Sequence, residues 1–279
     1  MMRLAVSNLA WPAHEEAAAF ARLAALGVAG VEVAPTRIAP WSEINPAMLT
    51  GYRAKLRGEG LCVSSLQAIF YGCDSFQLLG DGAAFAGLCE HMERVAGMAA
   101  TLGGEVLVFG APRNRRRGDL PEAEAWSLAQ DRFHRLGEIV AAEGVAIGIE
   151  PVPAFYGGDF LTTWQDVLQM VRDVAHLGIR VHLDAGCVGL GGGSIGEAIA
   201  SSHACLVHYH AAQPELAGFS PPADNHREAA TVLNACRYDR WVAIEMREQA
   251  NDPLLAIEQA VTEVQRIYSI SPSVATSAH

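Results

Sequence analysis

Four short segments in the second half of the chain each end on a side chain that can bind a metal ion or move a proton. The segments are GIEP with Glu150, VHLDAG with Asp184, VHYHAA with His208 and His210, and VAIEM with Glu245. Each side chain follows an apolar run of strand length, where a buried strand would end. Burial of a carboxylate is costly unless a cation or a hydrogen-bond donor compensates for it. The recurrence of such groups on four successive strands therefore indicates one shared site.

Three carboxylates in one cleft would repel one another and raise one another's pKa values unless a positive charge lay between them. A divalent cation is the simplest such charge. We therefore predict one divalent metal ion, held by the three carboxylates and one of the two histidines. Oxygen ligands with one imidazole suit Mn²⁺ best, with Mg²⁺ and Co²⁺ as alternatives, because structural zinc prefers thiolates and several histidines. The opposing interpretation is a set of unrelated salt bridges and capped loop ends.

The elements that would position these residues alternate regularly along the chain. Short runs rich in Val, Ile and Leu alternate with longer Ala- and Leu-rich segments of helical period, which is typical of repeated βα units around a parallel sheet. Eight units fit a single-domain (β/α)8 TIM barrel over residues 1–270, followed by a flexible C-terminal tail over 271–279. The predicted strands are 4–9, 30–34, 61–66, 105–110, 146–150, 180–184, 205–210 and 241–246. The predicted helices are 14–26, 46–59, 82–102, 121–143, 163–176, 194–202, 225–236 and 252–267.

Glycines that follow predicted helices support this division of the chain, because a left-handed helix cap favours glycine. They are Gly27, Gly60, Gly103, Gly144 and Gly178. Since the chemistry of such barrels lies at the C-terminal ends of the strands, the four segments should meet on one face.

Composition narrows the class of partner. The formal net charge of −11 argues against a nucleic-acid backbone, which is bound through clustered Lys and Arg. No apolar run reaches the length of a membrane span, and the N-terminal sequence lacks the pattern of a secretory signal. The six cysteines show no Cys-x-x-Cys spacing. We therefore expect a cytoplasmic protein with a small-molecule substrate, with no nucleic-acid or membrane partner, and with a homo-oligomer left open.

The motifs GIEP, HLDAG, HYH and WVAIEM, in this order on predicted strands five to eight, resemble those of the xylose isomerase-like barrel superfamily. This superfamily, also called AP endonuclease family 2, includes ketose 3-epimerases, hydroxypyruvate isomerase, inosose dehydratase and endonuclease IV. SLQAIFYG, FGAPRNR and YGGDFLTT extend the resemblance to a sugar isomerase/epimerase-like subgroup. The resemblance implies that the metal ligands are Glu150, Asp184, His210 and Glu245. His208 is then a nearby polar contact or a packed histidine.

The resemblance also implies a mechanism. In the epimerases, two metal-bound glutamates exchange a proton with the carbon next to a carbonyl, through a metal-bound enediolate. Glu150 and Glu245 match these glutamates. This chain departs from the pattern at three positions: Cys187 replaces a substrate-binding histidine, Pro153 replaces an asparagine, and Tyr156 replaces a further glutamate. Because a thiol is a poor hydrogen-bond donor, a known ketose specificity does not carry over.

Other candidate substrate contacts lie near the same strand ends. Arg113 and Arg115 follow strand four and could bind a phosphate or carboxylate through paired N–H donors, the alternative being a solvated loop. Arg247, two residues after Glu245, is a better anion-binding candidate. Two polar residues could bind sugar hydroxyls: Glu32 and Gln67. Three aromatic residues could form an apolar wall or simply pack: Trp11, Phe70 and Tyr156.

The favoured function is a metal-dependent isomerase or epimerase of a sugar or sugar-derived hydroxy-ketone. A lyase or dehydratase of a keto-sugar or cyclitol remains an alternative, because it begins with the same proton abstraction. An endonuclease IV-like nuclease is less favoured, because Glu32 and Gln67 stand where extra metal-binding histidines would be needed. A barrel that binds a sugar without turnover is a further alternative.

Overall fold

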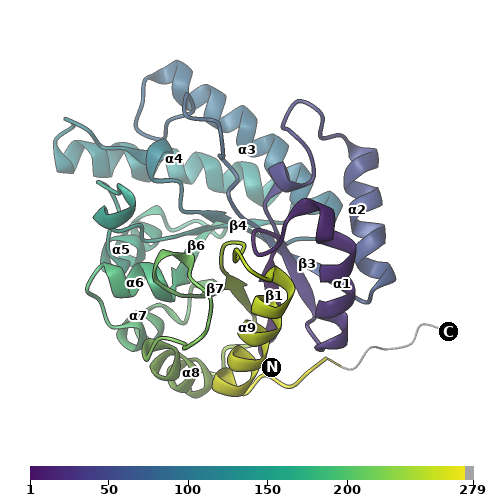
Figure 1. Cartoon of the computed structure of the whole chain (residues 1–279). Helices are drawn as coiled ribbons and strands as arrows, with labels where there is room; N and C mark the ends of the chain where they lie inside the picture. Colours follow the sequence, from purple (N-terminus) through teal and green to yellow (C-terminus); the bar gives the residue numbers. More distant parts are fainter. Residues whose placement is uncertain (274–279) are drawn as a thin grey trace.

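The computed structural model describes residues 1–273, which form a closed barrel of eight parallel strands in sequence order (Figure 1). Each strand pairs with the next, and the first pairs with the last. The strands are β1 (Arg3–Ser7), β2 (Gly30–Val33), β3 (Cys62–Leu66), β4 (Val106–Phe109), β5 (Ala146–Ile149), β6 (Ile179–Asp184), β7 (Leu206–Ala212) and β8 (Trp241–Glu245). The predicted (β/α)8 fold is confirmed, and residues 274–279 of the predicted tail lie outside the described residues.

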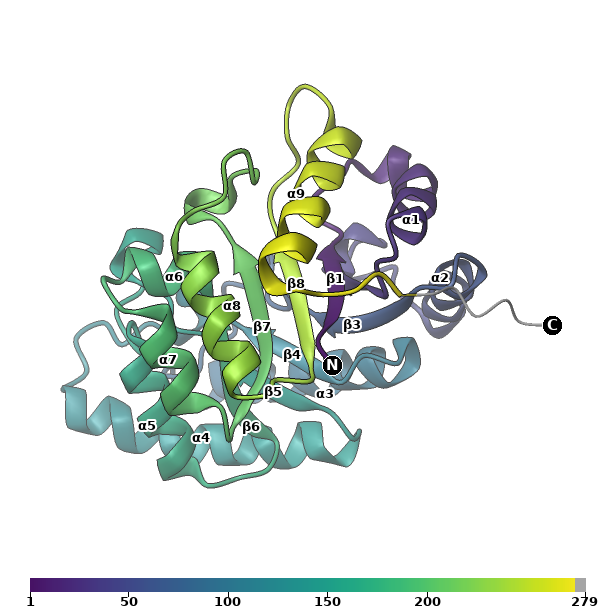
Figure 2. The same cartoon turned by 90° about the horizontal axis from the view of Figure 1, so that it is seen from below.

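Helices surround the barrel and cover its strands (Figure 1). They are α1 (Glu16–Ala25), α2 (Pro46–Gly58), α3 (Gly82–Leu102), α4 (Glu122–Ala142), α5 (Trp164–Val174), α6 (Ala185–Leu190), α7 (Ile195–Ser202), α8 (Asn225–Ala235) and α9 (Pro253–Tyr268). The first and last of the barrel helices, α1 and α9, lie side by side and are joined by an ion pair between Arg22 and Glu258, so the helical layer also closes (Figure 2). All seven residues of β7 are buried, as expected when helices cover the outside of a packed barrel.

Helix α6 is the main element that the sequence did not predict. It begins directly after β6, and the side chain of Asp184 accepts a hydrogen bond from the backbone N–H of Cys187 as its N-cap. The short Gly-rich segment Ala185–Leu190 lacks the apolar period by which longer helices are recognised. The cap matters for function, because it fixes one carboxylate oxygen of a predicted metal ligand.

The prediction of a left-handed helix cap is wrong at one position, Gly178. Gly27, Gly60, Gly103 and Gly144 have the expected positive φ, whereas the left-handed residue after α5 is Ala175, with φ of 51°. Gly178 is needed for a different reason: a Cβ atom there would collide with the carbonyl oxygen of Gly137 in α4. Glycine at this position therefore allows close packing between a helix and the chain entering β6.

Within residues 1–273, no helix is both long enough and apolar enough to cross a lipid bilayer.

Candidate functional site

The four predicted metal ligands come together at the C-terminal ends of β5 to β8. Glu150 follows β5 directly, Asp184 ends β6, His210 lies in β7 and Glu245 ends β8. The strand register places Asp184 beside His210. Side-chain atoms of Glu150, Asp184 and His210 lie within 4.8 Å of one another, and Nδ1 of His210 is 3.5 Å from Asp184 Oδ2 and 3.2 Å from Glu245 Oε2. The four groups thus converge around the ring of His210.

Burial and mutual repulsion perturb this cluster strongly. Burial and the neighbouring carboxylates of Asp184 and Glu245 raise the pKa of Glu150 to about 8. The pKa of Glu245 is also raised, mainly by burial, although His210 opposes the shift. Such shifts are expected where carboxylates crowd together without a cation between them.

Two polar atoms of the cluster lack hydrogen-bond partners among the described residues. Asp184 Oδ1 accepts the α6 cap bond of 2.6 Å, but Oδ2 is buried and makes no hydrogen bond. Nδ1 of His210 is also buried and makes no hydrogen bond. Buried polar atoms are normally satisfied, so both need a partner such as an ion. The donor set of three carboxylates and one imidazole fits a divalent cation.

The other side of the His210 ring is held by Glu32. Nε2 of His210 lies 2.9 Å from Glu32 Oε2, and Nε2 of His208 lies 2.9 Å from Glu32 Oε1. The hydroxyl of Ser65 donates to the same Oε1 at 2.7 Å. A proton on Nε2 of His210, donated to Glu32, leaves the Nδ1 lone pair directed towards Asp184 and Glu245. The carboxylate therefore sets both the orientation and the tautomer of this histidine.

This arrangement corrects the sequence-based assignment of Glu32 and narrows that of His208. Glu32 is completely buried and hydrogen-bonded to histidines, so it is not placed to contact a sugar hydroxyl as expected. Burial raises the pKa of Glu32, but His210 and His208 lower it by more, leaving it well below its usual value. His208 is a packed histidine, one of the two outcomes expected for it. His182 stacks against His208 at 5.3 Å between ring centroids and was missed, although it stands two residues before Asp184 just as His208 stands two before His210.

Glu150 is positioned by contacts to its backbone carbonyl and to its side-chain carboxylate. Arg115 donates to the backbone carbonyl of Glu150 at 2.7 Å, and the thiol of Cys187 lies 3.5 Å from Glu150 Oε1. A Cβ atom at Gly110 would collide with the Glu150 carboxylate, so glycine leaves the room that the carboxylate occupies. Arg115 is buried and also faces the carbonyl of Phe109, which corrects its assignment as an anion-binding residue.

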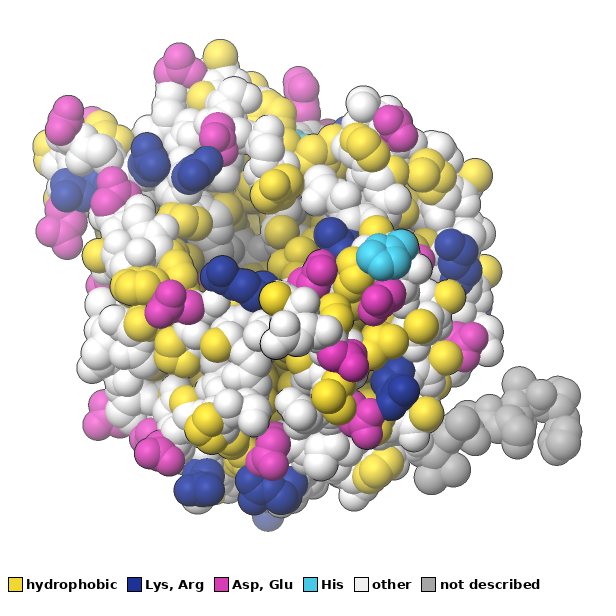
Figure 3. Space-filling model, in the orientation of Figure 1, with side chains coloured by type: hydrophobic (Ala, Val, Ile, Leu, Met, Phe, Trp, Pro, Cys, Tyr) yellow, Lys and Arg dark blue, Asp and Glu magenta, His cyan; other side chains and the backbone are white. Residues whose placement is uncertain are grey.

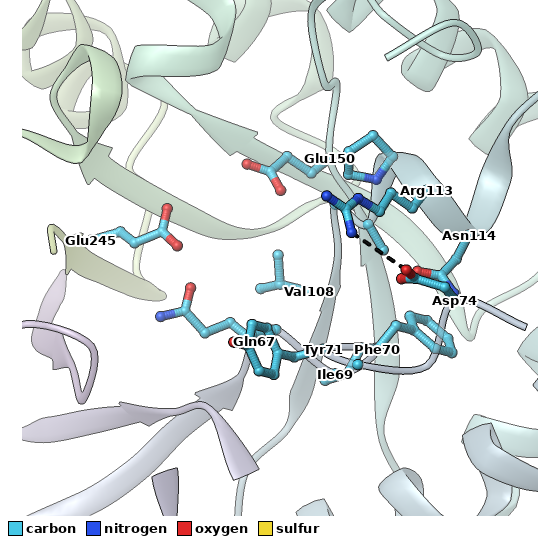
Figure 4. Close-up of a pocket in the computed structure, with 15 residues that line it drawn as sticks. Gln67, Ile69, Phe70, Tyr71, Asp74, Val108, Arg113, Asn114, Glu150 and Glu245 are labelled. Carbon is cyan, nitrogen blue, oxygen red and sulfur yellow. Dashed lines mark hydrogen bonds and ion pairs between the residues drawn. The ribbon is translucent and has the colours of Figure 1, made fainter. Parts of the chain in front are cut away.

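A cavity of about 560 Å³ opens beside this cluster (Figure 4). Figure 4 shows the carboxyl groups of Glu150 and Glu245 facing it from different strands. Its other lining residues are Val108 of β4 and residues of the segments after β3 and β4, namely Gln67, Ala68, Ile69, Phe70, Tyr71, Gly72, Asp74, Gly110, Ala111, Pro112, Arg113 and Asn114. Figure 3 shows a hollow near the middle of the face seen in Figure 1, bordered by side chains of several kinds.

The remaining predicted substrate contacts divide between this cavity and its surroundings. Gln67 and Arg113 line the cavity. Arg247 is exposed, and neither it nor Tyr156 belongs to the lining within the part of the chain that the structure describes. The Tyr156 hydroxyl instead accepts a hydrogen bond of 2.8 Å from the backbone N–H of Glu215, which joins the loops after β5 and β7. Of the three predicted wall aromatics, only Phe70 lines the cavity; Trp11 is buried.

Comparison with known proteins adds a family and a set of structural relatives. The model of the family described as xylose isomerase-like TIM barrel matches residues 20–266. No functionally curated protein matched the sequence. The chain is similar to D-psicose 3-epimerase from Clostridium cellulolyticum H10, with a TM-score of 0.80, 15% identity and coverage of 96% of this chain and 99% of that chain.

Two further solved structures show the same likeness. One is 3-keto-D-glucoside 4-epimerase from E. coli, with a TM-score of 0.75, 16% identity and coverage of 95% of this chain and 100% of that chain. The other is an AP endonuclease family 2 protein from Brucella melitensis, with a TM-score of 0.73, 15% identity and coverage of 92% and 97%. At these identities the likeness establishes a shared fold.

Proposed function

The chain belongs to the xylose isomerase-like TIM barrel family, and from this premise we propose that it is a metal-dependent isomerase or epimerase of a sugar or sugar-derived hydroxy-ketone. The observation that carries the proposal is the convergence of Glu150, Asp184 and Glu245 around the ring of His210, with both glutamates facing one cavity. The names of the solved D-psicose and 3-keto-D-glucoside epimerases support a keto-sugar as the class of substrate.

Glu150, Asp184, His210 and Glu245 would hold the cation, which we propose to be Mn²⁺, with Mg²⁺ or Co²⁺ as alternatives. Among the buried polar atoms of these four side chains, Asp184 Oδ2 and His210 Nδ1 make no hydrogen bond within residues 1–273. When bound, the cation supplies Lewis-acid chemistry that makes the hydrogen next to the substrate carbonyl more acidic.

The proton itself would be moved by the two glutamates. Glu150 and Glu245 enter the cavity from different strands, so one can remove a proton from the carbon next to the carbonyl while the other returns a proton to it. Burial disfavours the charged form of Glu150, so for the same surrounding charges its carboxylate is a stronger base than an exposed one. The contacts from Arg115 and Cys187 keep this carboxylate in place.

Deuterium exchange tests the proton transfer directly. Protein loaded with Mn²⁺ is incubated with D-psicose, D-fructose or a 3-keto-glucoside in D₂O, and the sugars are followed by NMR. We expect deuterium at the carbon next to the carbonyl, and a rate lowered by about 10²-fold or more in Glu245→Gln. Glu90→Gln, an exposed substitution on α3, serves as the matched control and should keep the wild-type rate.

Two outcomes would change the assignment. Release of water or of an aglycone, in place of an intact deuterated sugar, would favour the lyase or dehydratase. Exchange at the wild-type rate in Glu245→Gln would exclude Glu245 as a proton-transfer residue.

A further inference from the structure

The cavity that contains Glu150 and Glu245 extends well beyond them. Its volume of about 560 Å³ is within the range of pockets that enclose drug-sized ligands, and a monosaccharide alone fills only part of it. Away from the two glutamates the cavity is bordered by Ile69, Phe70 and Tyr71 (Figure 4). A substrate that fills the cavity must therefore have a second part besides the sugar.

The polar side chains in this outer part already have partners within the protein. Asn114 donates through Nδ2 to the carbonyls of Cys73 and Phe76, each at 2.8 Å. The Gln67 amide donates to the hydroxyl of Ser7. The guanidinium of Arg113 pairs with Asp74 at 3.4 Å, the contact drawn as a dashed line in Figure 4. These contacts engage part of the polar groups, and most of the remaining lining surface is apolar.

The apolar part of the lining is held in a fixed shape. The Trp41 indole donates to the carbonyl of Tyr71 at 2.7 Å, and His91 lies 2.7 Å from the carbonyl of Ile69. Two alanines of the lining, Ala68 and Ala111, have positive φ values of 50° and 30°, a backbone conformation that costs free energy in residues other than glycine. A wall that the fold maintains at this cost is preorganised for a ligand.

Tyr71 stands out within this wall. The residue is 71% exposed although its backbone carbonyl is hydrogen-bonded to Trp41, and it borders the cavity. An exposed aromatic ring beside a preformed cavity gains free energy when an apolar group covers it. The other exposed large apolar residues that the structure describes, Met1, Phe155, Leu177 and Leu255, lie outside the cavity lining.

We propose that the natural substrate is a keto-sugar bonded to an apolar or aromatic group, and that this group lies against a wall formed by Ile69, Phe70, Tyr71, Val108 and Pro112. The sugar then faces Glu150 and Glu245. This inference rests on the proposed function and adds the substrate class to it.

Methyl and phenyl 3-keto-β-D-glucoside provide a matched pair of probes, because they differ only in the group attached to the sugar. Dissociation constants are measured by calorimetry on Mn²⁺-loaded protein, and deuterium exchange is followed in parallel by NMR. We expect the phenyl compound to bind at least about tenfold more tightly than the methyl compound, from burial of its ring. Tyr71→Ser should reduce this ratio several-fold, while Tyr71→Phe, which keeps the ring, should preserve it.

Leu177→Ser is the control for removal of an exposed apolar side chain, because Leu177 precedes β6 at the opposite end of the barrel. It should leave the ratio unchanged. The inference would be overturned if wild-type protein bound the two compounds equally tightly, or if Tyr71→Ser left the ratio of their affinities unchanged. In either case, deuterium exchange on the methyl compound would still support the proposed function. If the phenyl compound bound in a way that depended on Tyr71 but no deuterium exchange occurred, the result would support the apolar wall as a binding site and contradict the proposed function.

Discussion

At the scale of single residues, His210 is the centre of the site. Its Nδ1 faces Asp184 and Glu245, and its Nε2 faces Glu32. Burial lowers the pKa of His210, but Glu32 and Glu245 raise it by more, so the net shift is upward. A ring nitrogen that is oriented by a carboxylate on its far side is the usual arrangement of a metal-binding histidine.

The role of Glu32 predicts the effect of replacing it. Glu32→Gln keeps the shape of the side chain but removes the charge that orients His210, so the affinity for Mn²⁺ should fall by about 10- to 100-fold. The affinity is measured by competition with a metal-binding dye on protein stripped of metal. Ser65→Ala, which removes only one hydrogen bond to Glu32, should have a smaller effect. An unchanged affinity in Glu32→Gln would show that Glu32 is only a packing group.

The convergence of Glu150, Asp184, His210 and Glu245 could be predicted from sequence because each stands at or near the end of a recognisable strand, while the choice of His210 over His208 came from the family resemblance. The partnership of Glu32 with His210 could not be predicted, because it joins residues far apart in the chain and depends on the strand arrangement across the barrel. Arg115 was misassigned for a related reason: a basic residue in a polar loop gives no sign that the loop folds inwards onto the Glu150 carbonyl.

At the scale of elements, the loops after the strands decide what the site can bind. The segments after β3 and β4 are tied to each other by the Asn114 bonds and by a backbone bond of 2.7 Å from Leu78 to Asn114. Helix periodicity and strand patterns predicted the barrel, but they carry no information on loop backbones such as that of Ala68, with its positive φ. The residues that line the cavity beside the two glutamates could therefore not be predicted from the sequence, apart from Gln67, Phe70 and Arg113.

A buried chain of hydrogen bonds joins α8, α9 and β7 and gives a prediction about pH. His226 Nδ1 lies 2.8 Å from the Tyr268 hydroxyl, which lies 3.1 Å from that of Tyr209. Burial lowers the pKa of His226 to about 4. Between pH 6.5 and 4 the unfolded chain therefore binds more protons than the folded chain, so the stability that His226 contributes is complete above pH 6.5 and declines as the pH falls.

His226→Asn removes the titrating ring while keeping an acceptor for Tyr268. The wild type should lose about 2 kcal/mol more than this variant between pH 7 and pH 5 in the free energy of unfolding. Urea titrations of metal-free protein at the two pH values measure the difference. Parallel losses in the two proteins would contradict the assignment of a neutral buried histidine.

At the scale of the whole molecule, the barrel places distant parts of the chain at one end of a single core. Parallel strands in sequence order bring the ends of β5 to β8 next to one another, which is why the order of the motifs sufficed to predict both the fold and the convergence of the four side chains. The solved structures of low identity support the same architecture over at least 92% of this chain.

Metal binding should stabilise the whole fold, because the crowded carboxylates of the metal-free protein repel one another. At a free Mn²⁺ concentration about 100-fold above the dissociation constant, the gain is about 2.7 kcal/mol, or roughly 5–10 °C in melting temperature for a domain of this size. Differential scanning fluorimetry with EDTA and then with Mn²⁺ measures the shift. Glu245→Gln should show a smaller shift. If Mn²⁺ did not change the melting temperature of the wild-type protein, the proposed metal site would be contradicted.

The most direct measurement is the metal content of freshly purified wild-type protein and of Asp184→Ala, determined by inductively coupled plasma mass spectrometry after exposure to Mn²⁺ and removal of free ions. The convergence of the four side chains predicts about one divalent ion per wild-type chain and almost none in the variant. A wild-type protein that retains no metal, or a variant that retains as much as the wild type, would contradict the central claim.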